Sequence, residues 1–290
     1  MKIAVNGRIC DDQEAVVSVY DHGFLYGIGL FETFRTYRGR PFLLEPHMGR
    51  LSRSCTELGI RYIPNAPETE SLIARLLSAN GLPDAYVRFS VSAGVDLLGL
   101  PTADYEKPNV IVYVKPLPPR DERTYTQGKP IQLLELRRNS PEGSVRYKSF
   151  HYMNNILAKR EMRRYEWAAG AEGIFLDGFG HVAEGIVSNL FWVKDEVVYT
   201  PSLVTGILPG ITREYVIGLA ERSGFDVREG LYEWSAVMEA DEAFITNSVQ
   251  EIVPVNRGYD TNGEARIIGG GLPGDLTRNL MKAYGVAAWE

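Results

Sequence analysis

The sequence predicts two mixed α/β domains, and three observations support this fold class. The chain has 290 residues, which exceeds a typical single domain and allows two cores. Strand-like and helix-like segments alternate on both sides of residue 120. Pro116–Arg123 is proline-rich, then charged, and has no hydrophobic periodicity, so it predicts a linker. We expect a small N-terminal α/β domain at 1–118, a linker at 119–126 and a larger C-terminal domain at 127–290.

The N-terminal domain is predicted to mix strands and helices. Runs rich in β-branched and aromatic residues predict strands at Val16–Val19, Leu30–Tyr37, Pro41–Leu44, Tyr86–Val91 and Val110–Val114. Apolar residues at helical spacing predict helices at Pro46–Leu58, closed by Gly59, and at Glu68–Asn80, closed by Gly81.

The C-terminal domain is predicted to continue in the same way. Strands are expected at Ile131–Leu136, Gly173–Leu176, Leu190–Val193, Val197–Thr200 and Glu242–Thr246. Helices are expected at Tyr152–Trp167, Gly210–Ser223 and Leu272–Tyr284. Two-domain enzymes often bind their ligands in the cleft between the domains.

Composition excludes several classes of protein. The formal net charge of −6 argues against a nucleic-acid surface, which is usually basic. Cys10 and Cys55 are the only cysteines, too few for a disulfide scaffold or a structural zinc site, and the four histidines lack metal-ligand spacing. No apolar run has membrane-spanning length, and the N-terminus turns polar too early for a signal peptide. We expect a cytoplasmic protein without a metal site.

A lysine and a glutamate give the first indication of chemistry. Lys148 lies where the pattern predicts the start of a helix, and the helix dipole there favours the neutral amine that Schiff-base chemistry needs. Glu184 follows 36 residues later in an acidic turn. On this pair alone, a solvated lysine and a turn glutamate are the better interpretation. Three further segments favour a functional interpretation of this pair instead.

Two of these segments lie in the C-terminal domain. Gly206–Arg213 is a glycine-rich turn that leads into a helix, and its Ile211-Thr212 end offers backbone N–H groups and a hydroxyl to an anion. The alternative is that Thr212 only caps the helix. Thr246–Glu251 follows a buried-looking strand, and its side chains, Ser248 among them, could bind a ligand or form a turn.

The third segment is the first predicted helix. Arg50 lies off its apolar stripe and would ordinarily be solvated. If Arg50 instead points into a cleft, its guanidinium fork suits a phosphate.

Together these segments resemble the fold-type IV pyridoxal-phosphate enzymes, a family of branched-chain aminotransferases, D-amino-acid aminotransferases and aminodeoxychorismate lyases. The order is a lysine before a helix, a Glu-Gly turn, the phosphate loop at Leu208–Arg213 and the Thr246–Ile252 segment. The N-terminal runs Asp21–Glu32 and His47–Leu51 agree, so the resemblance covers nearly the whole chain.

The resemblance implies the cofactor pyridoxal 5'-phosphate, bound between the domains of a homodimeric enzyme. It implies that Lys148 carries the cofactor and that Glu184 faces the pyridine nitrogen. Tyr152 would hydrogen-bond the ring oxygen, unless it is a core tyrosine. The residues implied for the phosphate are Arg50, Ile211, Thr212 and Ser248.

Within this family the chain is most similar to aminodeoxychorismate lyases of the Gram-positive type, notably in Arg137–Ser144 and Lys148–Asn155. Ile28 stands where the aminotransferases usually carry aspartate. Between Ser90 and Pro101 there is no arginine or histidine, so the carboxylate trap of the D-amino-acid enzymes has no counterpart. The implied reaction converts 4-amino-4-deoxychorismate to 4-aminobenzoate and pyruvate, a step of folate biosynthesis. A branched-chain or D-amino-acid aminotransferase is the alternative.

The small-molecule substrate of such a lyase has two carboxylates, which need cations or oriented donors. Tyr86 and Arg88 are two apart on a predicted strand and therefore point to one face. They are the first candidates, because the matching strand of the branched-chain enzymes faces substrate. Arg138 and Arg146, which flank the loop before Lys148, are the second. All four could also be surface residues or dimer contacts.

Overall fold

The computed structural model describes residues 1–289 of the chain. These residues form two compact units. The first unit comprises Met1–Pro119, Tyr147–His151 and Trp289, and the second comprises Arg120–Arg146 and Tyr152–Ala288. The chain therefore leaves the first unit after Pro119 and returns to it for the segment that carries Lys148.

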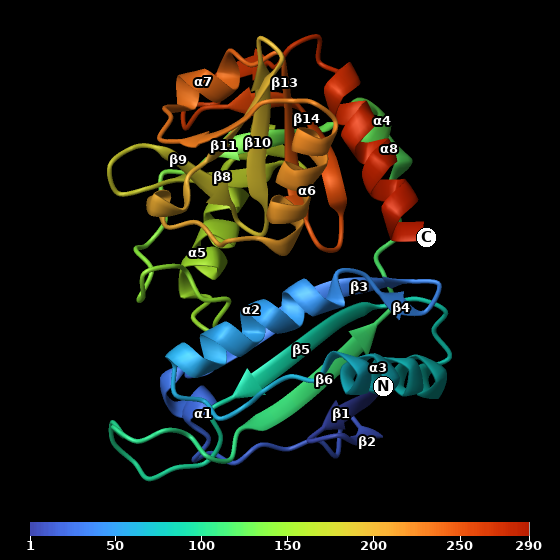
Figure 1. The fold of residues 1–290 in the computed structure, drawn as a ribbon. Helices are drawn as coiled ribbons and strands as arrows, with labels where there is room; N and C mark the ends of the chain where they lie inside the picture. The colour runs from blue at the N-terminus through green and yellow to red at the C-terminus, as the bar shows by residue number, and fades with distance from the viewer. Residues whose placement is uncertain (290) are drawn as a thin grey trace. The chain divides into compact units, whose positions relative to one another are not determined.

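The first unit contains a six-stranded sheet with the order β2-β1-β6-β5-β3-β4 (Figure 1). All of its pairings are antiparallel, and the longest ladder joins β3 to β5, from Gly29↔Ser92 to Arg35↔Tyr86. The strands are β1 Lys2–Val5, β2 Arg8–Asp11, β3 Gly29–Tyr37, β4 Arg40–Pro41, β5 Tyr86–Ser92 and β6 Asn109–Lys115.

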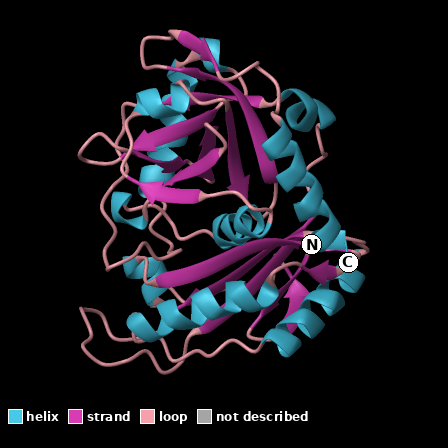
Figure 2. Cartoon of the chain, turned by 45° about the horizontal axis from the view of Figure 1, so that its top comes forward, coloured by secondary structure: helices cyan, strands magenta, loops and turns pink. Residues whose placement is uncertain are grey.

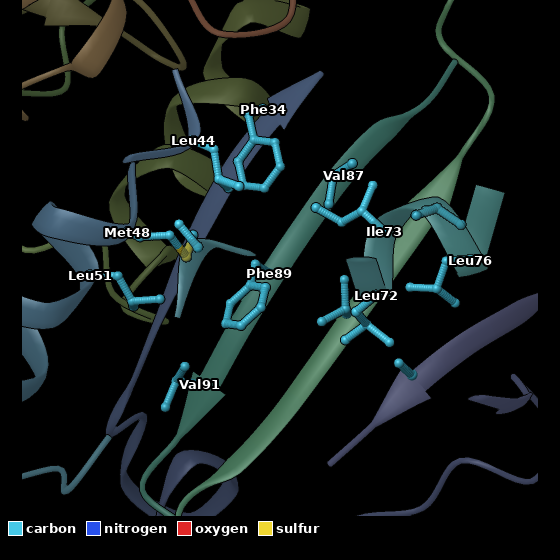
Figure 3. Packing of buried hydrophobic residues seen from close by; sticks show 14 of the residues in the cluster. Phe34, Leu44, Met48, Leu51, Leu72, Ile73, Leu76, Val87, Phe89 and Val91 are labelled. Atoms are coloured by element: carbon cyan, nitrogen blue, oxygen red, sulfur yellow. The ribbon is translucent and has the colours of Figure 1, made fainter. Parts of the chain in front are cut away.

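Helices α2 (Leu44–Glu57) and α3 (Ala66–Asn80) pack on one face of this sheet, whereas the short α1 (His22–Tyr26) precedes β3. Figure 3 shows the core that results, with side chains of β3 and β5 against those of both helices. Its labelled members are Phe34, Leu44, Met48, Leu51, Leu72, Ile73, Leu76, Val87, Phe89 and Val91. The Asn65 side chain caps α3, and Gly81, with φ 65°, ends it. Of these two features, the sequence predicted the end at Gly81.

The segment around Lys148 extends the same sheet. Ser149 pairs antiparallel with Leu30, and the Phe150 N–H donates to the Gly29 carbonyl at 2.9 Å. A Cβ on Gly29 would lie 2.3 Å from the Phe150 ring, so only glycine allows this approach. Since Leu30 points into the core, Lys148 and Phe150 point to the opposite face of the sheet.

The second unit contains a nine-stranded mixed sheet, ordered β12-β11-β10-β13-β14-β7-β8-β9 with β15 paired to β14. Its strands are drawn in magenta in Figure 2. The pairs β11–β12, β14–β7 and β7–β8 are parallel, and the other pairs are antiparallel. The strands are β7 Lys129–Leu133, β8 Glu172–Leu176, β9 Val182–Gly185, β10 Asn189–Lys194, β11 Val197–Pro201, β12 Val227–Gly230, β13 Glu242–Asn247, β14 Glu251–Tyr259 and β15 Ala265–Ile267.

Strands β10 and β13 carry apolar side chains on both of their faces. Trp192 and Ile245 join one core with Val237 of α7, whereas Phe191 and Phe244 stack at 5.0 Å on the opposite face. The helices of this unit are α4 Glu122–Gln127, α5 Met153–Glu161, α6 Ile211–Arg222, α7 Trp234–Met238 and α8 Asp275–Trp289. No helix within residues 1–289 is long and apolar enough to cross a membrane.

Several sequence predictions need correction. Val16–Val19 is irregular and largely exposed rather than a strand, because no strand within residues 1–289 pairs with it. Leu44 opens α2 instead of ending a strand, so β4 is only two residues long. The helix expected over Tyr152–Trp167 ends at Glu161 and continues as two short 3₁₀ turns. Helix α4, Glu122–Gln127, occupies most of the linker expected at 119–126.

The placement of Lys148 at a helix start was also wrong. Helix α5 begins at Met153, five residues later, and Lys148 lies in extended backbone beside β3. Because the field of a helix terminus falls off within its first turn, the dipole argument does not apply to this lysine.

Candidate functional site

In the first unit, Lys148 and Arg88 lie against the same aromatic ring. The Lys148 Nζ is 4.7 Å from the centroid of Phe31, and the Arg88 guanidinium carbon is 3.6 Å from it. The register of β3 and β5 explains this arrangement, since Thr33 pairs with Arg88 and Phe31 with Ser90 on the face opposite the helices. The structure therefore brings the predicted catalytic lysine close to one of the first candidates for substrate binding.

The guanidinium of Arg88 is available to bind an anion. Its Nε donates to Ser90 Oγ at 3.2 Å, and within residues 1–289 no carboxylate lies within ion-pair distance of it. A cavity of about 390 Å³ opens beside it, lined in part by Ser90, Ser92, Tyr113 and Phe150. A half-buried cation next to hydroxyl groups is suited to a carboxylate.

Tyr86 lies on the same face of β5 as Arg88, as the spacing predicted, but it is not among the residues that line this cavity. The Lys115 ammonium lies 4.4 Å from its ring centroid. Tyr152 is the half-buried residue that immediately precedes α5, so it is not on the helix as expected.

Arg50 is buried, with a side-chain exposure of 8%, so the alternative of a solvated residue does not hold. Its Nε and Nη2 donate to the two oxygens of Glu32 at 2.8 and 2.5 Å. His47 Nδ1 lies 2.7 Å from the same carboxylate. Burial alone would raise the pKa of Glu32, but the charge of Arg50 and the bonds from His47 and Arg50 outweigh it and lower the pKa to about 2. Glu32 therefore fixes the orientation of Arg50.

In the second unit, Glu184 is buried on β9 and both of its oxygens are bonded. Arg138 Nε donates to Oε1 at 2.8 Å, and the backbone N–H of Leu208 donates to Oε2 at 3.0 Å. Asn189 reaches Oε2 at 3.4 Å and the Leu208 carbonyl at 3.0 Å. The carboxylate is thus held in one orientation.

Arg138 and Arg146 are both buried, and most of their donors are engaged inside the second unit. Arg138 Nη1 donates to Asn154 at 2.7 Å. Arg146 donates to the Gly206 carbonyl at 2.5 Å and to the Asn139 carbonyl, and its Nε lies 3.9 Å from Glu184. Burial and the nearby Arg138 lower the pKa of Arg146 to about 10.

The predicted phosphate loop forms the start of α6. The residue before the helix is Gly210, which offers no side-chain cap, so Thr212 is not the helix cap. A Cβ on Gly210 would lie 2.1 Å from Asn189 Oδ1. The Thr212 and Ser248 hydroxyls lie 3.0 Å apart, and the buried Thr246 hydroxyl has no hydrogen-bond partner within the described chain. Uncapped N–H groups beside two hydroxyls fit a phosphate.

Sequence reasoning missed Phe31, Glu32, His47 and Asn189. Glu32 carried a usable signal, because it lies between the apolar residues Leu30 and Phe34 on the same face of β3 and would need a cation there when buried. The role of Phe31 depends on the pairing of Ser149 with Leu30, which no local pattern reveals. Residues 1–289 contain no group of three or more histidine, cysteine, aspartate or glutamate side chains that could hold a metal ion.

Comparison with protein families gives a match to the amino-transferase class IV model over residues 29–257. The aminodeoxychorismate lyase of Bacillus subtilis (strain 168) is 44% identical over 295 residues, covering 99% of each chain. The putative branched-chain-amino-acid aminotransferase of Methanocaldococcus jannaschii is 36% identical and covers 98% of this chain and 95% of its own.

Solved structures agree on the fold. The 4-amino-4-deoxychorismate lyase of Pseudomonas aeruginosa superposes with a TM-score of 0.83 at 29% identity, over 97% of each chain. The branched-chain amino acid aminotransferase of Escherichia coli gives a TM-score of 0.86 at 29% identity, over 98% of this chain and 93% of its own. The fold is therefore that of the fold-type IV aminotransferases, and the predicted resemblance is confirmed.

Proposed function

Because the chain belongs to the amino-transferase class IV family, we propose that it is a pyridoxal-phosphate-dependent lyase. Its substrate is 4-amino-4-deoxychorismate, and its products are 4-aminobenzoate and pyruvate. The observation that carries the choice of reaction is the 44% identity to the Bacillus subtilis lyase across the full length of both proteins.

Residues within each unit have the chemistry that the cofactor needs. Lys148 would supply the amine that carries pyridoxal 5'-phosphate, and Glu184 would face the pyridine nitrogen. The uncapped start of α6 at Ile211 and Thr212, with Ser248, fits the phosphate, and Arg50 adds a cation that Glu32 keeps oriented. Tyr152 is the proposed partner of the ring oxygen. Bound pyridoxal phosphate supplies an electron sink for the carbon that bears the substrate amine.

Lys148 Nζ acts as the base in this proposal. It takes the proton from the amine-bearing ring carbon, after which the neighbouring carbon–oxygen bond breaks and the enolpyruvyl group leaves. That group gains a proton and becomes pyruvate, while the ring becomes aromatic. No second substrate is needed, because the atoms of the two products sum to those of the substrate.

Arg88 binds a substrate carboxylate in this proposal. It has no carboxylate partner of its own within the described residues, and it shares the Phe31 ring with Lys148. The hydroxyls of Ser90 and Tyr113 line the adjoining cavity and offer further donors. Tyr86, on the same face of β5, remains a candidate for the second carboxylate.

An aminotransferase is the second candidate, supported by the 36% identity to the archaeal protein. It would use the same lysine and cofactor but would need a keto-acid acceptor. The exposed loop between Ser92 and Pro101 carries Leu97, Leu98 and Leu100 and neither arginine nor histidine, which counts against a D-amino-acid enzyme.

The test uses purified holoenzyme and enzymatically generated 4-amino-4-deoxychorismate without any keto acid. Equimolar release of pyruvate and 4-aminobenzoate over many turnovers is the expected result. Absence of both products, together with amino transfer to 2-oxoglutarate, would instead identify an aminotransferase. Lys148→Ala should abolish either activity, and full activity in that variant would refute the proposed role of the lysine.

A further inference from the structure

Among the buried arginines, Arg138 stands out because its hydrogen bonds are directed to a group that the proposed function requires. Its Nε is bonded to Glu184 at 2.8 Å, and its Nη1 is bonded to Asn154 at 2.7 Å and lies 3.4 Å from Asn155. Its guanidinium carbon lies 5.3 Å from the centroid of the Phe175 ring. The side chain is therefore held by polar partners at two ends and by an aromatic ring.

The environment of Glu184 shows what this arrangement achieves. A carboxylate that serves a ring nitrogen has to keep one rotamer, with an oxygen directed at that nitrogen. Leu208 N–H and Asn189 hold Oε2, and Arg138 alone donates to Oε1 at less than 3 Å among the described residues. Without Arg138, Oε1 would lose its charge-assisted bond and the carboxylate could rotate about its last torsion.

We propose that Arg138 is a positioning residue that orients Glu184 toward the pyridine nitrogen, with Asn154 as its support at the start of α5. This inference rests on the proposed function only in assuming that Glu184 faces the cofactor. It reassigns Arg138, because its Nε and Nη1 are bonded to Glu184 and Asn154. Nη2 is then the one guanidinium nitrogen without a partner among the described residues, and a bidentate bond to a substrate carboxylate needs two such nitrogens.

The experiment compares Arg138→Gln with wild-type holoenzyme. The dissociation constant of pyridoxal phosphate should rise roughly 10- to 100-fold, the range for a lost hydrogen bond to a charged group. The pH at which the cofactor absorbance changes should shift, and kcat should fall while KM for the amine substrate stays within about twofold. Arg88→Gln is the matched control and should show the reverse, with KM raised and the absorbance titration unchanged.

Two further variants keep the test decisive if Arg138→Gln does not fold. Asn154→Ala leaves the charge of Arg138 in place and should shift the absorbance titration in the same direction by a smaller amount. Adding Arg138→Gln to Glu184→Gln should cost little beyond Glu184→Gln alone, because the two residues act as one unit. The inference is overturned if Arg138→Gln raises KM while cofactor affinity and absorbance match the wild type. Cofactor binding needs no substrate, so this outcome is distinct from a failure of the lyase assay.

Discussion

Arg88 differs from the other buried or half-buried arginines of the candidate site in lacking an acidic partner within the described chain. We expect Arg88→Gln to raise KM for the dicarboxylate substrate about 10- to 100-fold, since a hydrogen bond to a charged group contributes about 1.5–3 kcal/mol. Steady-state kinetics would measure it. Lys115→Gln, on the same face of the next strand but outside the cavity, should leave KM unchanged. An unchanged KM in Arg88→Gln would remove Arg88 from substrate binding.

The free energy of unfolding at acidic pH depends in part on the buried carboxylate of Glu32. Its pKa in the folded chain is about 2, below the ordinary 4.5, so its stabilisation is complete above pH 4.5 and is lost as the pH falls toward 2. This contribution is about 3 kcal/mol at neutral pH. Glu32→Gln should therefore unfold more easily at about pH 6 but show a shallower loss of stability between about pH 5 and pH 2. Urea unfolding followed by circular dichroism would measure both slopes.

The control for this prediction is Glu45→Gln, because Glu45 is an exposed carboxyl in the first turn of α2. Its unfolding free energy should follow the wild-type pH curve closely. Parallel curves for wild type and Glu32→Gln would mean that the Arg50 pair contributes no acid-sensitive stability.

At the scale of helices and strands, the sequence correctly predicted the features that depend on neighbouring residues alone. Gly81 ends α3 as expected, and alternation in β5 correctly placed Tyr86 and Arg88 on one face. Val16–Val19 failed because β-branched residues favour strands only where a partner strand exists. The extended conformation at Lys148 could not be predicted, because it depends on pairing with Leu30, more than a hundred residues earlier in the chain.

That pairing leads to a prediction about Gly29. A Cβ there would lie 2.3 Å from the Phe150 ring, so Gly29→Ala should displace the Lys148 segment from β3 and destabilise the first unit by about 1–3 kcal/mol. Cofactor incorporation, read from visible absorbance, should fall with it. Gly178→Ala is the control, since a Cβ at Gly178 meets nothing within 4 Å. Wild-type absorbance and melting temperature in Gly29→Ala would show that Phe150 can move without consequence.

At the scale of the whole molecule, the exposed apolar loop of the first unit bears on assembly. Leu97, Leu98 and Leu100 are 84%, 67% and 86% exposed, a cluster that is uncommon on a monomer surface. Together with the family resemblance this supports a homodimer, which light scattering coupled to size exclusion should detect. Leu98→Glu should shift the protein toward monomer, whereas Ile63→Glu, equally apolar and exposed in the wild type, should not. A monomeric wild type would contradict this prediction.

The return of Tyr147–His151 to the first unit has a consequence for recombination between relatives. A fragment that ends at Pro119 carries all six strands of the first sheet and both covering helices, but not the lysine. A chimera that joins residues 1–119 of one parent to the remainder of another would bring one parent's Gly29 into contact with the other parent's Phe150. Successful chimeras should therefore inherit Gly29 and Phe150 from a single parent, although 120 positions separate them in the gene.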